Sequence, residues 1–348
     1  MNVRKKNNLL IVLLCLMTGL SSCNNKEDAF TEQPPVARVT LIPSIGGPGD
    51  NGYNDLILSG VIRFGQRTGT ELSLVQPHSI DDARTVITKW MSRVSDEEVL
   101  LVLGGSDYEE IAKSECKSLD SKHRVLLFEA DTAGMPQGVS TFSINRYGAS
   151  YLAGCMAQKS STAHIIMAMP GIDTNEKAAQ GFRDGYETHA SDARLVMHYL
   201  SSGVSGFAMP DSAFKLAAQM NEDFVFPLAG GSNNGIYKYA AGTLFVTMLV
   251  AGMDVDCAAQ CKRVPFSLVV HIDSLVEQYL DNWNKGEGLP RYACYGLSSG
   301  FVDIVTTPTY FYNFDFNDLY EYYYFEKDYW SNLYKQYFDE AVKAEQNF

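Results

Sequence analysis

Short apolar runs and longer amphipathic runs alternate along most of this chain. The short runs are rich in β-branched residues, as expected of strands, whereas the longer runs repeat apolar residues at helical spacing. In the first half, the pattern predicts strands at residues 39–42, 72–75, 99–103 and 125–128, and helices at residues 55–68, 81–95 and 107–116. Such a series is typical of a parallel sheet covered by helices on both faces.

A second series of the same kind follows the first. It comprises helices at residues 146–159, 176–189 and 212–220, and strands at residues 164–168, 195–199 and 224–228. We therefore expect an α/β protein with two doubly wound parallel-sheet units, joined near residues 143–145. In open sheets of this type, ligands bind beyond the carboxyl ends of the strands.

Two glycine-rich loops occupy such positions. Gly105 and Ser106 follow a predicted strand and open a helix, and the loop at residues 230–235, which contains Gly231, does the same in the second unit. Each loop could bring backbone amides close to a polar ligand, or it could only make a tight turn from strand to helix.

Signatures of catalysis are weak. The segment 230–234 approaches a GxSxG nucleophile elbow, but Asn234 stands where the final glycine is needed. The chain has no HExxH, P-loop or GxGxxG motif, and its six histidines are scattered. We expect no enzymatic activity, no cofactor and no metal site.

The N-terminus has the architecture of an export signal. Arg4, Lys5 and Lys6 precede an apolar run at residues 9–20, which is too short to span a bilayer comfortably. Cys23 follows directly after small residues and resembles the cysteine of a bacterial lipobox. Residues 1–22 are then a lipoprotein signal peptide, and Cys23 is the lipidated N-terminus of the mature chain. The alternative is an ordinary secretory signal with an incidental cysteine.

A polar, acidic stretch follows at residues 23–36 and predicts a flexible tether. Its segment Lys26-Glu27-Asp28 resembles the acidic export tags of surface lipoproteins in Bacteroidetes-type bacteria, but it is equally consistent with a soluble linker. The lipoprotein could therefore face the periplasm or lie on the outer-membrane surface.

Removing the signal peptide leaves 326 residues, of which 25 are basic and 41 acidic, and moves the formal net charge from −13 to −16. Nucleic acid is an unfavourable partner for so acidic a chain. No second apolar run reaches the length of a transmembrane helix, so only the lipid is expected to hold the protein at a membrane.

Five cysteines remain after cleavage and lipidation: Cys116, Cys155, Cys257, Cys261 and Cys294. An odd set cannot be fully paired. Cys257 and Cys261 could form a short local disulfide, but their spacing fits neither a CxxC redox motif nor a zinc site. We favour structural thiols over metal or redox chemistry.

The C-terminal segment 310–348 holds nine of the twenty tyrosines. From Asn317 onwards, apolar residues recur at helical spacing and predict a long amphipathic helix. Its aromatic face would either pack against the body of the protein or offer a surface to carbohydrate or protein. The residues of this face are Leu319, Tyr323, Trp330, Leu333, Tyr337 and Ala341.

Seven sequence blocks between about residues 39 and 305 resemble, in order, those of the basic membrane protein family, the lipoprotein receptors of purine nucleoside ABC transporters. The block at 48–54 is similar to the family's D-x-S-F-N, 148–154 to G-A-F-L-A-G, 180–186 to A-G-F-x-x-G, 206–210 to F-D-D-P, 229–231 to A-A-G-G, 251–254 to I-G-V-D, and 267–271 to T-S-V-V-K. Each block is weak alone, but their common order makes the resemblance specific.

This resemblance implies a type I periplasmic binding fold, in which two lobes joined by three crossovers close on a solute like a flytrap. Lobe 1 would comprise residues 37–143 with part of 270–305, and lobe 2 residues 144–269. The Tyr-rich helical extension at residues 306–348 would follow them.

The resemblance also implies roles for particular residues. Tyr53 and Phe207 match the aromatic positions that sandwich a base, and Asn54 matches an amide that reads the base. Asp254 matches a carboxylate that accepts from ribose hydroxyls, and Gly231 matches a backbone contact. Asp50 belongs to the first matching block.

Two positions depart from the family's pattern. Ser44 stands where the family has an early aspartate, and His271 stands where it has a lysine. Serine carries no charge, and histidine replaces a long ammonium by a short, titratable ring. We still expect both to contact the ligand, but with weakened binding of the ribose.

The leading hypothesis is a lipid-anchored receptor that captures a nucleoside-like molecule and delivers it to an ABC permease. An alternative is a surface-exposed interaction lipoprotein that uses the bilobal fold and its Tyr-rich tail to bind glycan or protein. An enzyme acting in the cleft is a third and weaker alternative.

Overall fold

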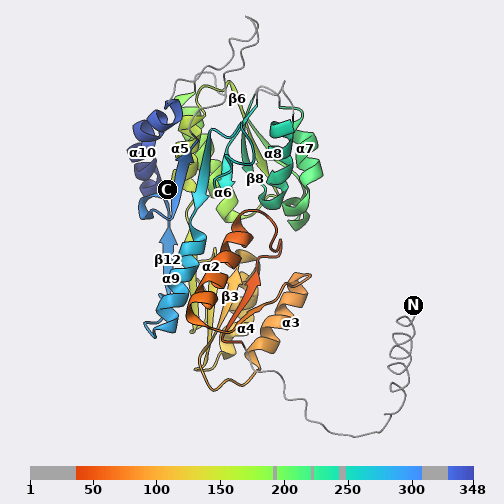
Figure 1. Ribbon diagram of the computed structural model, residues 1–348, viewed down its shortest axis with the longest axis vertical. Coiled ribbons are helices and arrows are strands. Elements are labelled where there is room, and N and C mark those ends of the chain that lie inside the picture. Colours follow the sequence, from red (N-terminus) through yellow and green to blue (C-terminus); the bar gives the residue numbers. More distant parts are fainter. Residues whose placement is uncertain (1–36, 191–193, 221–222, 243–247, 308–327) are drawn as a thin grey trace, which may run out of the picture. The chain divides into compact units, whose positions relative to one another are not determined.

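The computed structural model describes residues 37–190, 194–220, 223–242, 248–307 and 328–348 (Figure 1). The predicted signal peptide, Cys23 and the tether lie outside these residues, as do the tyrosines from Tyr310 to Tyr324. Within the described residues, no helix is both long and apolar enough to cross a membrane.

The first half of the protein is built on a six-stranded parallel sheet with the strand order β12-β5-β4-β3-β1-β2. Helices α2 (Tyr53–Thr68) and α9 (Ile272–Asn284) cover one face, and α3 (Ile80–Met91) and α4 (Glu109–Glu115) cover the other. The strands are β1 (Val39–Pro43), β2 (Leu72–Leu74), β3 (Val99–Gly104), β4 (His123–Phe128), β5 (Val139–Ile144) and β12 (Tyr292–Tyr295).

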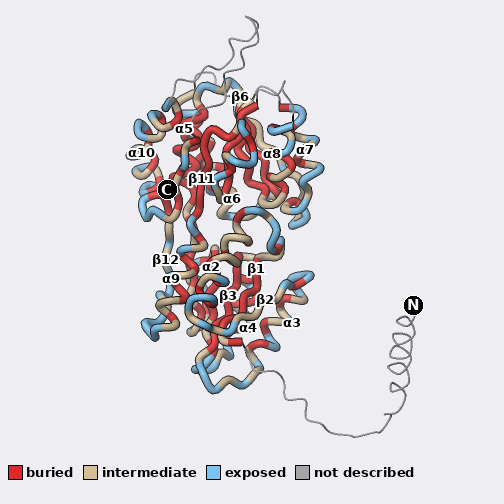
Figure 2. The backbone as a smooth tube through the Cα atoms, viewed as in Figure 1, coloured by how far each residue is buried: buried red, intermediate tan, exposed pale blue. Residues whose placement is uncertain are grey.

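The second half contains a four-stranded parallel sheet with the order β7-β6-β8-β9. Helices α5 (Tyr147–Met156) and α6 (Asp173–His189) pack on one face, and α7 (Pro210–Ala217) and α8 (Asn233–Gly242) on the other. The strands are β6 (Thr162–Met167), β7 (Arg194–Tyr199), β8 (Phe224–Leu228) and β9 (Leu249–Val250). Figure 2 shows the buried residues concentrated around the strands of both halves.

A third, three-stranded sheet belongs to the second half. In it, β11 (Phe266–Val270) pairs in parallel with β10 (Gly252–Asp254) and in antiparallel fashion with β13 (Val302–Thr306). The chain therefore passes between the halves three times: after β5, after β11 and after β12. The alternating pattern of the sequence did not predict this sheet.

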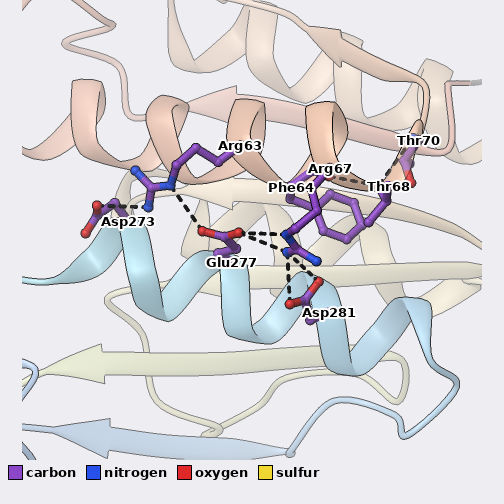
Figure 3. Close-up of polar contacts among 8 residues, drawn as sticks. All are labelled: Arg63, Phe64, Arg67, Thr68, Thr70, Asp273, Glu277 and Asp281. Atoms are coloured by element: carbon purple, nitrogen blue, oxygen red, sulfur yellow. Dashed lines mark hydrogen bonds and ion pairs between the residues drawn. The ribbon is translucent and has the colours of Figure 1, made fainter.

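The return of α9 to the first half is secured by its contact with α2, more than 200 residues earlier (Figure 3). Arg63 pairs with Asp273 at 2.9 Å and Glu277 at 3.1 Å, and Arg67 pairs with Glu277 at 2.9 Å and Asp281 at 2.8 Å. Ion pairs that are partly exposed to water contribute little energy each. These four pairs, the arginine ladder, therefore chiefly set the register between the two helices.

Helices α5 and α6 cross at close range because glycines lie at their contact. A Cβ atom at Gly154 would lie 2.2 Å from the carbonyl oxygen of Phe182, and one at Gly185 would lie 2.0 Å from that of Tyr151. Any side chain at these positions would force the helix backbones apart. All ten residues of α5 are buried, because α10 and the third sheet pack on it as well as α6.

The last helix, α10 (Tyr329–Asn347), packs on the other side of α5. Its buried face consists of Trp330, Leu333, Tyr337 and Ala341, which is the described part of the predicted aromatic face. This face therefore packs against the body of the protein rather than offering a surface for carbohydrate. The buried carboxylate of Glu345 accepts hydrogen bonds from the Leu297 amide at 2.9 Å and the Ser298 hydroxyl at 3.2 Å.

Cys257 and Cys261 are both buried free thiols, so the local disulfide that their spacing allowed is absent from the described structure. Cys116 and Cys155 are likewise buried and free, whereas Cys294 is exposed.

We predict that Gly185→Ala destabilises the protein by about 1–3 kcal/mol. The new methyl group would clash with backbone atoms, which a side-chain rotation cannot move aside. Alanine favours helix formation over glycine by about 1 kcal/mol, so any loss of stability must come from packing. The control is Gly203→Ala, where a Cβ atom would meet nothing within 4 Å. Urea unfolding of both variants measures the difference, and equal midpoints would contradict the prediction.

Candidate functional site

A cavity lies between the two halves, beyond the carboxyl ends of their parallel strands, as expected for ligand sites in open α/β sheets. The first half contributes the segments that follow β1, β3 and β4. The second contributes those that follow β6, β7 and β8, together with β10. The lining residues are Ser44, Ile45, Gly46, Asp50, Tyr53, Asn54, Gly105, Ser106, Asp107, Glu129, Arg146, Ile172, Thr174, Asn175, Phe207, Leu228, Gly230, Gly231, Met253 and Asp254.

Nine of the ten residues singled out by the sequence lie on this lining. They are Ser44, Asp50, Tyr53, Asn54, Gly105, Ser106, Phe207, Gly231 and Asp254. His271 is absent from the lining. It is exposed at the first turn of α9, where its amide donates to the carbonyl oxygen of Phe301. His271 is the single residue between the end of β11 at Val270 and the start of α9 at Ile272, the helix that leads back to the first half.

The loop before α2 is organised by Asp50. Its carboxylate accepts from the backbone amides of Gly52 and Asn54, both at 2.9 Å, and from the Asn54 side chain at 3.1 Å. The Asn54 side-chain oxygen in turn accepts from the Ser44 amide at 3.0 Å. Both ends of the Asn54 side chain therefore hold the loop, and only the remaining N–H and lone pair are left for a ligand.

Phe207 is positioned by contacts with the loop after β8. The Ser232 hydroxyl donates to the Gly206 carbonyl and accepts from the Met209 amide, both at 2.7 Å. Gly230 has a φ of 54°, and a Cβ atom there would lie 2.9 Å from the Phe207 ring. Ser232, the serine of the near-match to a nucleophile elbow, is therefore a buried structural residue.

The centre of the cavity contains an ion network that the sequence analysis missed. Arg146, at the start of α5, pairs with Glu129 at 2.7 Å and reaches Asp254 at 3.9 Å. Its guanidinium carbon lies 5.7 Å from the centroid of the Tyr53 ring. Only 7% of the Arg146 and Glu129 side chains is exposed, so these charges interact with little screening by water.

Glu129 could have been found from the sequence. It follows directly after a predicted strand, at the same sheet edge as Gly105. It adopts a φ of 58° and accepts a hydrogen bond from the Ile144 amide at 3.1 Å. Arg146 gave a weaker signal, because an arginine at the start of a helix is usually a solvated side chain.

The lining is strongly acidic. Its carboxylates are Asp50, Asp107, Glu129 and Asp254, and Arg146 is the one basic side chain among the described residues that line it. Burial raises the pKa of Asp107 above its ordinary value, and the Ile45 amide partly opposes this shift by donating to it at 3.2 Å. The cavity therefore disfavours anionic ligands and suits neutral or cationic ones with several hydrogen-bond donors.

Asp254 is the most perturbed of these carboxyl groups. Its pKa is raised to about 6: burial is the main cause, Arg146 opposes the rise, and nearby Asp50 and Glu129 add to it. Asp254 also adopts a φ of 64°, which is unusual for a residue with a side chain. Burial likewise raises the pKa of Tyr53, whose hydroxyl has no hydrogen-bond partner among the described residues.

The two halves touch at the rim of this cavity. The Asn51 side-chain amide donates to the side-chain oxygen of Asn234 at 3.4 Å. The Asn234 amide donates in turn to the Asp50 carbonyl at 3.5 Å and to the Gly231 carbonyl at 3.0 Å. These contacts join the loop before α2 to the start of α8.

We predict that Asp254→Asn stabilises the ligand-free protein at pH 7.5 by up to about 3 kcal/mol. The folded pKa of about 6 lies above the ordinary 3.8, so the carboxyl group's contribution to stability is greatest at low pH and is lost as the pH rises through 6. At pH 4 the variant and the parent should be equally stable.

The control is Asp96→Asn, which changes an exposed carboxylate in the loop before β3. Urea unfolding at both pH values measures the effect. An Asp254→Asn variant with unchanged stability at pH 7.5 would mean that the carboxylate is not destabilised by its surroundings.

Solved structures with the same fold come from several bacteria and an archaeon. A solute-binding protein of an ABC transporter system from Aeropyrum pernix K1 aligns with a TM-score of 0.64 at 18% identity, over 77% of this chain and 76% of that chain. A transcriptional activator of the comK gene from Bacillus halodurans aligns with a TM-score of 0.62 at 14% identity, over 88% of this chain and 97% of that chain. An ABC transporter solute-binding protein from Burkholderia graminis, in complex with D-arabinose, aligns with a TM-score of 0.57 at 14% identity, over 81% of this chain and 97% of that chain.

No curated protein matches the chain significantly in sequence. The model of the family described as PnrA-like ABC transporter substrate-binding protein, however, matches residues 42–323. This range includes both halves of the fold and every lining residue of the cavity. The family match confirms the resemblance seen in the sequence blocks, and it identifies a solute-binding function rather than an enzymatic one. The chain therefore belongs to the PnrA-like family of ABC transporter substrate-binding proteins.

Proposed function

We propose that this protein is a lipid-anchored receptor that captures a nucleoside between its two halves and delivers it to an ABC permease. The observation that carries the proposal is the presence of Tyr53 and Phe207 on one cavity, each from a different half of the protein. Aromatic rings from opposite sides suit a flat base, and each stacking contact is worth about 1–3 kcal/mol.

The polar residues suit the sugar. Ribose hydroxyls can donate hydrogen bonds to Asp254, which lies beside the only basic group of the described lining. The acidic lining favours a nucleoside over a nucleotide, because a phosphate would meet four carboxylates. Ser44 replaces the family's early aspartate and lies on the lining, whereas His271 lies away from it, so the ribose would be held by fewer charged groups.

The Burkholderia graminis protein in complex with D-arabinose raises a related candidate, a free pentose. A pentose would use the carboxylates, but its saturated ring would give neither aromatic ring a planar partner. The presence of aromatic rings on both halves therefore favours the nucleoside.

Membrane attachment is proposed from the sequence. A signal peptide at residues 1–22 and acylation of Cys23 would anchor the body to a membrane, either on its periplasmic side or on the outer-membrane surface. The polar stretch at residues 24–36 would leave the two halves free to open and close. The permease partner follows from the family, whose members bind substrates for ABC transporters.

The ligand is best tested by thermal-shift screening of residues 24–348 against nucleosides, bases, pentoses and amino acids. Nucleosides should raise the melting temperature in a concentration-dependent way. The absence of a shift with any nucleoside at millimolar concentration would remove the nucleoside from the proposal, and a shift with pentoses alone would replace it.

For the ligand that the screen identifies, Phe207→Ala and Tyr53→Ala should each weaken binding by about ten- to a hundredfold. Tyr53→Phe keeps the ring and should bind nearly as well as the parent. Phe301→Ala is a matched control, because Phe301 is a partly buried phenylalanine outside the cavity. Isothermal titration calorimetry gives the affinities, and unchanged binding in both alanine variants would place the ligand elsewhere.

The anchor is tested by Cys23→Ser in the full-length chain. We expect the parent to fractionate with membranes and the variant to be released into the soluble fraction, since no thiol would remain at the acylation position. Cys294→Ser, which changes an exposed cysteine, is the control. A Cys23→Ser protein that stays with the membrane as completely as the parent would argue against lipid anchoring.

A further inference from the structure

Three potential metal ligands come together where α10 packs against the second half, away from the cavity. Cys155 lies near the end of α5, His189 is the last residue of α6, and Glu340 lies in the middle of α10. One ligand atom from each, a sulfur, a nitrogen and an oxygen, lies within 4.8 Å of the other two. The imidazole Nε2 of His189 is 2.8 Å from Glu340 Oε1.

The surroundings of these three residues suit an ion. Cys155 is fully buried, but 21% of the His189 side chain and 40% of the Glu340 side chain is exposed. An ion could therefore enter from solvent, and water could complete its coordination. The Tyr151 hydroxyl donates to Glu340 at 2.6 Å, and the His189 ring lies 4.4 Å from that of Tyr337. Such outer contacts orient metal ligands in known sites.

The donor set is characteristic of zinc. Thiolate, imidazole and carboxylate are the three ligand types that Zn²⁺ takes in proteins, at about 2.0–2.3 Å from the ion. In a tetrahedral site these distances place the ligand atoms roughly 3.3–3.7 Å apart. The three atoms would need to shift by about 1 Å, which side-chain rotations can supply. A thiolate and a carboxylate would also neutralise the charge of the ion.

We propose that Cys155, His189 and Glu340 bind a Zn²⁺ ion, which fastens the C-terminal helix α10 to α5 and α6. Binding replaces the S–H bond of Cys155 by an S–Zn bond and releases one proton to solvent. Water occupies the fourth position. The site has a structural role, because it joins segments that are 185 residues apart in sequence at the surface of the second half.

The protonation states agree with this assignment. Burial raises the pKa of the Cys155 thiol, and the nearby Glu340 carboxylate raises it further, so a thiolate at this position needs a cation. Burial also acts to raise the pKa of Glu340, but the Tyr151 hydroxyl and the His189 ring together keep it below its ordinary value. Glu340 is therefore ionised and ready to bind.

The experiment is titration of the metal-free protein with Zn²⁺ in competition with a chromophoric chelator. We expect one ion per chain at this site and a rise in melting temperature on binding. Cys155→Ala, His189→Gln and Glu340→Gln should each weaken that binding by more than about tenfold. Cys116→Ala is the matched control, because Cys116 is an equally buried thiol in the first half.

Cobalt provides a second measurement on the unaltered chain. Bound Co²⁺ should show a thiolate-to-metal charge-transfer absorption that disappears when Zn²⁺ is added. The proposal is overturned if the protein binds no Zn²⁺, if the three variants bind it as tightly as the parent, or if Co²⁺ shows no thiolate absorption. In those cases the cluster is only a hydrogen-bonded contact that docks α10.

Discussion

The close approach of α5 and α6 is the contact on which the second half of this protein depends. Glycines at the crossing bring one helix backbone almost against the other, and α5, which α10 covers as well, is buried along its whole length. The position of α5 in turn sets the positions of other parts. Arg146 directly precedes its first turn and lines the cavity, its last turn carries Cys155, and its outer flank contacts α10. A shift of α5 would move all three.

Arg146 connects this packing to the cavity between the two halves. It is a buried cation at the point where the chain first passes from one half to the other, and it lies between Glu129 of the first half and Asp254 of the second. Removing the arginine would leave two buried carboxylates uncompensated, which is far more costly than losing a surface pair, whereas neutralising Asp254 would still leave Arg146 paired with Glu129. The arginine ladder between α2 and α9 is of the weaker, surface kind (Figure 3). The two networks therefore differ in role: the exposed ladder sets a register, and the buried triad fixes charges on the wall of the cavity.

The sequence blocks that carry the family resemblance have two different structural roles. Gly154 and Gly185 come from blocks whose glycines allow helices to cross, and they do not lie on the cavity. Asp50, Gly231 and Asp254 come from blocks that line it. The resemblance was reliable for the fold because both kinds of block had to be present and in order. It was less reliable for single residues: His271 occupies the place of a ligand-binding lysine in the pattern, yet it lies at the exposed start of α9.

The sequence by itself determined the α/β alternation and most strands and helices, because local periodicity is a property of short segments. Nine residues of the cavity lining were also indicated, some by their position after a strand and most by the resemblance of ordered sequence blocks to a known family. In the first sheet, strands β5 and β12 escaped prediction because one mixes polar with apolar residues and the other is a short edge strand. Only the tertiary structure decided which side chains meet. The pairing of Arg146 with Glu129 and Asp254, the use of Asn54 to hold a loop, and the meeting of Cys155 with His189 and Glu340 join residues from different elements. Such contacts depend on how the elements pack in space, which periodicity along the chain does not encode.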